Sequence, residues 1–219
     1  MRIIEPYVEI WDCPRDLKLI ERAGRVCYKS EGKITDGSDK KFVEGIIRRG
    51  HESVIEHEKA TALFVMDRIG SQSIVRHRIA SYSQESTRFC NYSGDRFGNE
   101  ITVIKPFFFD KYDKKGLWQT ACYTAQQYYF LLLDAGATPQ EARSVLPNSL
   151  KTEIVVTYNL REWRHFFKLR CAKDAHPQMQ QVAIPLLLHF KEILPEIFGD
   201  VPYNEDFDTK YYAEIKTPV

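Results

Sequence analysis

The sequence lacks long hydrophobic runs and paired cysteine motifs, and each absence narrows the class of protein. No segment approaches the roughly 18 consecutive apolar residues of a membrane-spanning helix, so we expect no membrane association. The first residues lack the basic stretch and apolar segment of a secretory signal, and we therefore expect a cytoplasmic protein. The 5 cysteines are scattered and never spaced as C-x-x-C, which indicates neither a disulfide framework nor a thiolate zinc site.

An excess of charge of one sign is also absent. The chain has 31 Lys and Arg residues against 30 Asp and Glu, so its whole surface is not shaped to hold a polyanion, and any anion site must be local. No G-x-G-x-x-G motif follows a predicted strand, which leaves a Rossmann-type dinucleotide fold unsupported. No histidine pair or Cys/His group has metal-ligand spacing, so we expect no metal.

Periodic patterns that are present predict the secondary structure. Apolar residues at helical spacing, with capping residues, predict helices over 15–29, 42–50, 117–133, 139–146, 160–171 and 177–198, the last bent at Pro185. Short apolar or β-branched runs predict strands over 59–66 and 152–158. The segment 81–98 and the tail after Gly199 are expected to be irregular. At 219 residues the chain suits one domain, 1–219.

A basic segment between residues 76 and 88 is the strongest candidate for a binding site. It carries three arginines against one carboxylate in a nearly neutral chain. Guanidinium groups match phosphate oxygens, and neighbouring hydroxyls complete a phosphate shell, while Tyr82 and Phe89 offer surfaces for a planar ring. The alternative from composition alone is a solvated basic loop that makes surface ion pairs.

The spacing within this segment is more specific than its composition. Arg76-His77-Arg78, seven residues and then Ser86 resembles the signature of the flavin-dependent thymidylate synthases. The resemblance extends over about residues 10–200, to three further blocks in family order: His51-Glu52-Ser53 with Glu56 and His57, Glu141 to Pro147, and Asn159-Leu160-Arg161 through Leu169-Arg170 and His176.

The resemblance implies an α+β fold, with a central, mostly antiparallel sheet flanked by helices, in a homotetramer whose active sites are shared between subunits. It implies that FAD is held by Ser53, Glu56, Arg76, His77, Arg78, Gln84, Asn159, Arg161 and His165. It implies that deoxyuridine monophosphate (dUMP) is held by Ser73, Arg76, Gln84, Glu85, Ser86, Thr87, Arg88, Arg143 and Arg170.

The reaction implied by the resemblance methylates dUMP to thymidine monophosphate (dTMP). 5,10-Methylenetetrahydrofolate supplies the carbon, and NADPH reduces the flavin that donates hydride. Arg170 matches the arginine that favours the ionised uracil, an electrostatic role. Ser86 has no base beside it in the sequence and is assigned to binding, and no cysteine matches a nucleophile.

Two positions depart from the family pattern or vary within it. Many members have Gln three residues before R-H-R, where this chain has Ser73, with Gln72 adjacent. The spacing from Arg170 to His176 also varies, which leaves His176 without a role. Ser73 supports the alternative of an inactive relative that binds nucleotide.

The helix predicted after Asn159 gives a check independent of the resemblance. Trp163, Phe166 and Phe167 form its apolar stripe, and Arg170 follows them by seven, four and three residues. A cation directed toward an aromatic side needs an anionic or polar partner. That partner is either a ligand or an internal carboxylate. Arg161, His165 and Lys168 share the opposite face of this helix.

A different class of function also accounts for the basic segment. In a nucleic-acid-binding module, its arginines contact phosphates and its aromatic rings stack on bases. Such a module binds oligonucleotides in a salt-sensitive way and is colourless, whereas a flavoenzyme is yellow and prefers a mononucleotide. The resemblance favours the enzyme, with dUMP and folate as partners and no nucleic acid.

Overall fold

The computed structural model describes residues 1–94, 97–111 and 114–217. Its strands are β1 (Arg2–Ile4), β2 (Tyr7–Asp12), β3 (Lys59–Asp67), β4 (Ala80–Gln84), β5 (Thr102–Ile104), β6 (Lys151–Asn159) and β7 (Glu214–Lys216). Its α-helices are α1 (Lys18–Val26), α2 (Ser38–Arg48), α3 (Arg68–Ile74), α4 (Lys115–Asp134), α5 (Pro139–Ala142), α6 (Leu160–Arg170), α7 (Pro177–Ile193) and α8 (Pro195–Phe198). The short 3₁₀ helices are η1 (Glu31–Lys33), η2 (Glu52–His57), η4 (Phe107–Lys111), η5 (Arg143–Val145) and η6 (Thr209–Tyr211).

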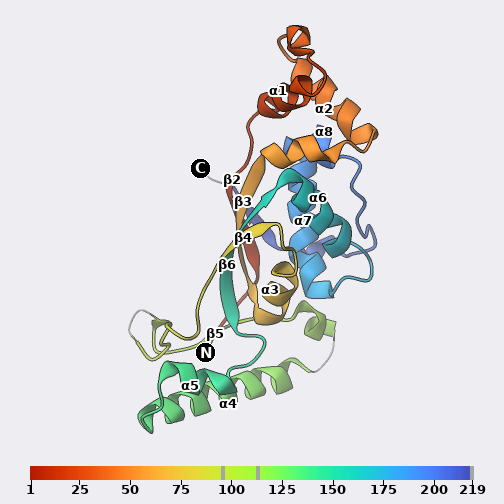
Figure 1. Cartoon of the computed structure of the whole chain (residues 1–219). Helices are drawn as coiled ribbons and strands as arrows, with labels where there is room; N and C mark the ends of the chain where they lie inside the picture. Colours follow the sequence, from red (N-terminus) through yellow and green to blue (C-terminus); the bar gives the residue numbers. More distant parts are fainter. Residues whose placement is uncertain (95–96, 112–113, 218–219) are drawn as a thin grey trace.

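A five-stranded sheet in the order β4-β6-β3-β2-β7 forms the centre of the molecule (Figure 1). Neighbours from β4 to β2 are antiparallel, but β2 and β7 are parallel, and β1 and β5 form a separate parallel pair. The α+β class is confirmed, whereas the mostly antiparallel sheet is corrected to a mixed one. The sheet is mixed because of β7, a short strand in the tail that was expected to be irregular. It pairs in parallel with β2, which requires a long crossover connection between the two strands.

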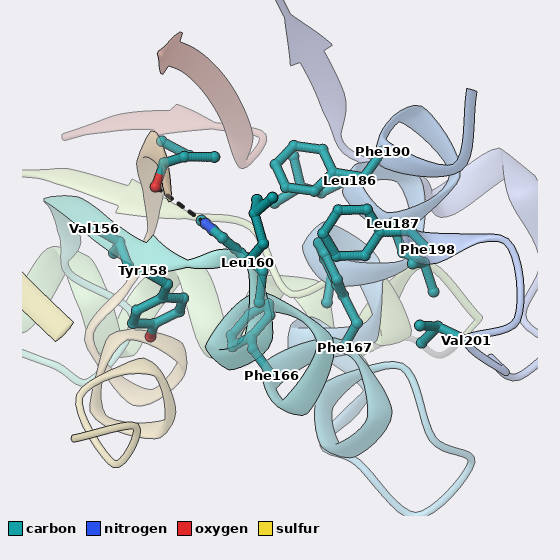
Figure 2. Close-up of a cluster of buried hydrophobic side chains, with 14 of the residues drawn as sticks. Val156, Tyr158, Leu160, Phe166, Phe167, Leu186, Leu187, Phe190, Phe198 and Val201 are labelled. Atoms are coloured by element: carbon teal, nitrogen blue, oxygen red, sulfur yellow. Dashed lines mark hydrogen bonds between the residues drawn. The ribbon is translucent and has the colours of Figure 1, made fainter. Parts of the chain in front are cut away.

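One face of the sheet is buried under α6 and α7 (Figure 1). Along β6, Thr152, Ile154, Val156 and Tyr158 alternate inward, because successive strand residues point to opposite faces. Figure 2 shows Val156 and Tyr158 in one cluster with the phenylalanines of α6, α7 and α8. The predicted strands over 59–66 and 152–158 are therefore confirmed as β3 and β6, which pair along their whole length.

Helix α6 begins at the residue that the sequence predicts as its cap. The Asn159 side chain accepts a hydrogen bond from the Glu162 amide at 2.8 Å, which satisfies one free donor of the first turn. Trp163, Phe166 and Phe167 are fully buried, as the predicted apolar stripe requires. This stripe fixes the rotation of the helix and so decides where its polar side chains point.

The predicted helix over 177–198 is two helices in the structure. Leu194 leaves the helical conformation, with φ −133° and ψ 56°, and Pro195 opens α8. A proline suits the first turn of a new helix because its missing N–H has no partner there. Pro185 lies inside α7, which continues through it. The segment 81–98, expected to be irregular, begins instead with strand β4. The sequence pattern did not reveal this strand because it is a polar edge strand without apolar alternation.

A second, smaller hydrophobic core lies at the far end of the sheet. It includes Ile101, Val103, Cys122, Tyr129 and Leu150, and α4 covers it. Helix α4 confirms the prediction over 117–133, and Thr138 with Glu141 forms the predicted cap of the following helix. Figure 1 shows α4 and α5 at one end of the molecule and α1 and α2 at the other. Among the described residues, no helix is long and apolar enough to cross a membrane.

Candidate active site

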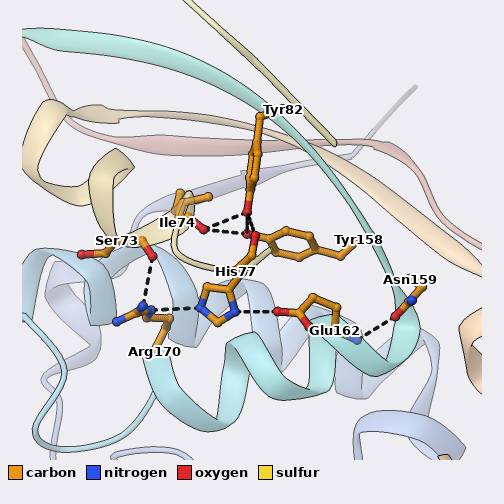
Figure 3. Close-up of polar contacts among 8 residues, drawn as sticks. All are labelled: Ser73, Ile74, His77, Tyr82, Tyr158, Asn159, Glu162 and Arg170. Atoms are coloured by element: carbon orange, nitrogen blue, oxygen red, sulfur yellow. Dashed lines mark hydrogen bonds and ion pairs between the residues drawn. The ribbon is translucent and has the colours of Figure 1, made fainter. Parts of the chain in front are cut away.

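The turn that carries Arg76, His77 and Arg78 joins α3 to β4. The His77 side chain is buried, whereas Arg76 and Arg78 reach solvent. The hydroxyl of Tyr82 lies within hydrogen-bond distance of the His77 and Ile74 carbonyl oxygens and of the Tyr158 hydroxyl (Figure 3). Two tyrosines therefore hold the backbone of this turn. The Tyr82 hydroxyl thus stabilises the backbone of this turn, whereas the sequence predicted only a stacking surface for its ring.

A chain of hydrogen bonds runs from α6 through this turn and back to α6 (Figure 3). Nδ1 of His77 lies 2.8 Å from Oε1 of Glu162, and Nε of Arg170 donates to Nε2 of His77 at 3.2 Å. Since an arginine nitrogen can only donate, Nε2 of His77 is an acceptor and the imidazole proton lies on Nδ1. His77 is therefore neutral in this arrangement.

Arg170 has no carboxylate partner in the part of the chain that the structure describes. Its Nη2 donates to the Ser73 carbonyl oxygen at 3.0 Å, so Ser73 contacts it through the backbone rather than the hydroxyl. Partial burial lowers the pKa of Arg170, and the nearby charge of Arg76 lowers it further. Of the two partners that the sequence allowed, the internal carboxylate is not found. The guanidinium is positioned and desolvated, but its charge is not neutralised.

Except for Gln84, which lies on β4, the residues predicted to hold FAD form two neighbouring groups. Nη1 of Arg161 lies 2.5 Å from Oε1 of Glu56, and both line a hollow of about 280 Å³ with Asn159 and His165. Ser53 and Arg161 also line a larger groove of about 1040 Å³ between α1, α2 and η2. His77, Arg76 and Arg78 lie on the turn beside the smaller hollow, which includes Ile79.

The larger groove contains a basic lining that the sequence analysis missed. Its cations are Arg25, Lys33, Lys41, Arg48, Arg49 and Arg161, and its only lining carboxylate among the described residues is Glu52. Two of these cations, Arg25 and Arg161, already pair with Glu21 and Glu56. Lys41 and Arg48 are seven residues apart and thus share one face of α2, a spacing visible in the sequence. The groove is therefore suited to an extended anion with several phosphate charges.

The residues predicted to hold the dUMP phosphate lie near α5. They are separate from Arg170, which lies at the end of α6. Nη1 of Arg143 lies 3.3 Å from the Thr87 hydroxyl, and the Arg88 guanidinium stacks on the Phe89 ring at 5.2 Å. The Arg88 amide donates to the Ser86 hydroxyl. Within the described residues, no hydrogen bond or ion pair links this group with Arg170 in the same chain.

Gln84 and Glu85 connect the phosphate candidates to the sheet. The Gln84 amide nitrogen donates to the hydroxyls of Ser71 and Thr152 at 2.9 and 3.1 Å. Glu85 pairs with Lys151 at 2.8 Å and accepts from the Tyr92 hydroxyl at 3.0 Å. Both side chains already have protein partners, which fixes their orientation.

A metal site, and a reactive thiol at Cys13, Cys122 or Cys171, find little support in the geometry. Ligand atoms of His77, Glu162 and His165 lie within 4.8 Å of one another, close enough for a metal, but the Arg170 cation beside His77 opposes one. Burial raises the pKa of Cys13 to about 12 and raises those of Cys122 and Cys171. A thiol in such a setting stays protonated and is a poor nucleophile.

Comparisons with known proteins cover most of the chain. Residues 9–196 match the family model Thy1, described as thymidylate synthase complementing protein. The chain is 36% identical over 185 residues to a flavin-dependent thymidylate synthase of Geobacter sulfurreducens, covering 81% of this chain and 78% of that protein. It is 33% identical over 200 residues to a flavin-dependent thymidylate synthase of Mycobacteroides abscessus, covering 83% and 78%.

A solved structure shares the fold. The crystal structure of the UMP/dUMP methylase PolB from Streptomyces cacaoi, bound with 5-Br dUMP, superimposes with a TM-score of 0.76. The match covers 91% of this chain and 96% of that one at 23% sequence identity. At this identity the likeness establishes the fold.

Proposed function

The chain belongs to the Thy1 family of flavin-dependent thymidylate synthases, and we propose that it methylates dUMP to dTMP with a reduced flavin. The observation that carries this proposal is Arg170. Its guanidinium is partly buried and fixed by His77 and Ser73, yet no carboxylate in the described chain neutralises it. A desolvated cation of this kind stabilises negative charge on a bound ligand.

The substrate ring supplies the anionic partner that Arg170 lacks within the described chain. Carbon 5 of uracil attacks the electrophilic one-carbon unit as a nucleophile, so it must first be activated by negative charge on the pyrimidine ring, as in the ionised uracil. Arg170 stabilises this charge without a proton transfer, because a guanidinium stays protonated in proteins. Catalysis by this group is then a matter of placement and electrostatics, and no cysteine or serine nucleophile is required.

The fit to FAD rests on the basic groove. Its volume of about 1040 Å³ and its excess of cations suit the diphosphate and adenosine parts of a dinucleotide. The smaller hollow with Glu56, Asn159, Arg161 and His165 adjoins the His77 turn. When bound, the flavin supplies hydride, which NADPH replenishes, while 5,10-methylenetetrahydrofolate supplies the carbon.

The substrate phosphate falls to Ser86, Thr87, Arg88 and Arg143. Helix α5 and the η5 turn that carries Arg143 pack against α4, away from α6 (Figure 1). A single chain therefore offers the phosphate group and Arg170 without a contact between them. This separation supports the proposal of a homotetramer in which one subunit supplies the phosphate site and another supplies Arg170.

A titration of the visible spectrum tests the proposal. Purified protein supplied with FAD should show flavin absorption bands that shift on addition of dUMP but not of deoxyuridine, which lacks the phosphate. With NADPH and methylenetetrahydrofolate, it should form dTMP, detected by mass spectrometry. Absence of flavin binding under every condition would contradict the proposal.

The same samples distinguish the alternatives. A nucleic-acid-binding module would show salt-sensitive binding of an oligonucleotide and no flavin bands. An inactive relative would bind dUMP but form no dTMP.

A further inference from the structure

Glu162 is a buried carboxylate that neither the family signature nor the composition singled out. It is 8% exposed and lies on the first turn of α6, three residues after the Asn159 cap. A glutamate at this position commonly accepts a hydrogen bond from the cap amide. Here its Oε1 is directed instead to Nδ1 of His77, 85 residues earlier in the sequence. The carboxylate therefore serves a tertiary contact.

The geometry of this contact determines the state of His77. Nε2 of the imidazole accepts from Nε of Arg170, so a proton on Nε2 would place two donors face to face. A carboxylate on the opposite side of the ring favours the proton on Nδ1. Burial lowers the pKa of His77, although the Glu162 hydrogen bond raises it, so the neutral ring is favoured.

We propose that Glu162 is a positioning residue for the methyl transfer, acting on Arg170 through the imidazole of His77. By holding His77 in the tautomer with Nδ1 protonated, Glu162 keeps Nε2 available to accept from Arg170. The Ser73 carbonyl oxygen fixes a second nitrogen of the same guanidinium. Together these contacts fix the direction in which the remaining N–H groups of Arg170 point. This role rests on the proposed function, in which Arg170 faces the substrate ring.

A purely structural role accounts less well for this carboxylate. Arg164, its near neighbour on α6, pairs with Glu52 and Asp200 and does not need Glu162. A buried carboxylate is costly unless it is hydrogen-bonded, and a hydrophobic residue would fill the same space more favourably. The compensating benefit is the control of one imidazole proton beside a catalytic cation.

The experiment compares three variants of the full-length protein, Glu162→Ala, Glu162→Gln and Glu192→Gln. Glutamine keeps an oxygen that accepts from Nδ1, whereas alanine removes it. Glu192 is an exposed carboxylate on α7 and serves as the matched control. The readouts are kcat and KM for dUMP, and the ¹⁵N chemical shifts of His77 in histidine-labelled protein, identified by their loss in a His77→Gln variant.

We expect the alanine variant to lose about tenfold or more in kcat with less than about a threefold change in KM, because a misplaced group costs rate more than binding. The glutamine variant should stay within about threefold of the wild type, and the Glu192 variant should match it. The His77 shifts should show one tautomer in the wild type and glutamine variant, and a mixture in the alanine variant.

Wild-type kcat in the alanine variant, or an unchanged His77 tautomer, would overturn the inference. Equal losses in the alanine and glutamine variants would also overturn it, because the hydrogen bond would then not be the cause. A wild-type protein that forms no dTMP would contradict the proposed function instead. In that case the His77 shifts still decide whether Glu162 controls the imidazole.

Discussion

Helix α6 carries two buried or half-buried arginines whose surroundings are opposite. Arg164 is 2% exposed and donates to both carboxylate oxygens of Asp200 at 2.6 and 2.8 Å and to Glu52 at 3.0 Å. Although burial disfavours its charge, Asp200 and Glu52 raise the pKa of Arg164. Arg170 is fixed by an imidazole and a carbonyl oxygen, and its pKa is lowered.

The partners of the two arginines indicate which of them contributes to stability and which is available to a ligand. A buried cation that is saturated with carboxylates is a structural element, because no charge remains for a ligand. A buried cation held only by neutral acceptors is oriented but unsatisfied, which is typical of functional sites. We therefore expect the same residue type on one helix to serve both purposes, with its partners deciding which.

The largest expected effect on stability follows from breaking the saturated region. Arg164→Ala removes a buried side chain, leaves Asp200 without Arg164 and leaves Glu52 with only the more distant Lys168, so it should lower the free energy of unfolding by about 3 kcal/mol. Urea unfolding at fixed protein concentration measures this change. Arg170→Ala, measured in the same way, should lose less than about 1 kcal/mol. Similar losses in both variants would remove the distinction between the two regions.

The next effect breaks the unsatisfied region. Arg170→Ala should reduce dTMP formation by about 100- to 1000-fold, since one preorganised electrostatic group is removed. Flavin absorption should remain, because the groove residues are unchanged. Turnover and flavin spectra of the same preparation measure both quantities. Undiminished turnover would exclude Arg170 from the site.

The pH dependence of stability sharpens the comparison. The pKa of His77 is lowered by burial, so its contribution is present above the unfolded value of about 6.5 and lost as the pH falls below it. The hydrogen bond to Arg164 lowers the pKa of Asp200, so that contribution is lost only below about 4.

Melting temperatures between pH 4.5 and 8 test this order. The wild type should lose stability below about pH 6.5, and a His77→Gln variant should lose less over the same interval. Identical slopes in the two proteins would show that His77 is not the group responsible.

The smallest effect concerns an ion pair outside both regions. Lys173 and Asp206 lie 2.7 Å apart, but both are mostly exposed. Exposed pairs contribute little, because water and salt screen them. Lys173→Ala should leave the melting temperature and turnover unchanged, which makes it the baseline for the other variants. A clear loss of stability would show that carboxylate pairing stabilises this chain even in solvent.

Local sequence patterns predicted α6 well, because its information is contained within about a dozen residues. The Asn159 cap, the aromatic stripe and the inward direction of Arg170 all follow from spacing along one helix. The partner of Arg170 could not be predicted from these local patterns, because His77 lies 93 residues away in the sequence. Only the packing of α3 against β6 and α7 brings His77 to Arg170. Glu162 was missed because its position three residues after the cap is typical of a capping glutamate, whereas its actual contact is with the distant His77.

The sheet shows the same limit. Strands β3 and β6 are long and carry their apolar pattern with them, so the sequence identified both. Strand β7 has only 3 residues and gains its structure from pairing with β2, which makes the sheet mixed. Strand β4 is polar because it lies at an edge. The separation of Arg143 from Arg170 is likewise a tertiary fact that no local pattern carries.

The two hydrophobic cores differ in size, and residues proposed for the active site rest on both of them. Arg143 and Thr87 belong to the end of the molecule built on the smaller core under α4, whereas Arg170 and His77 rest on the larger one. Small cores open locally more often than large ones, and amide exchange reports such opening. We therefore expect backbone amides at the end that carries Arg143 to exchange faster than those at the end that orients Arg170.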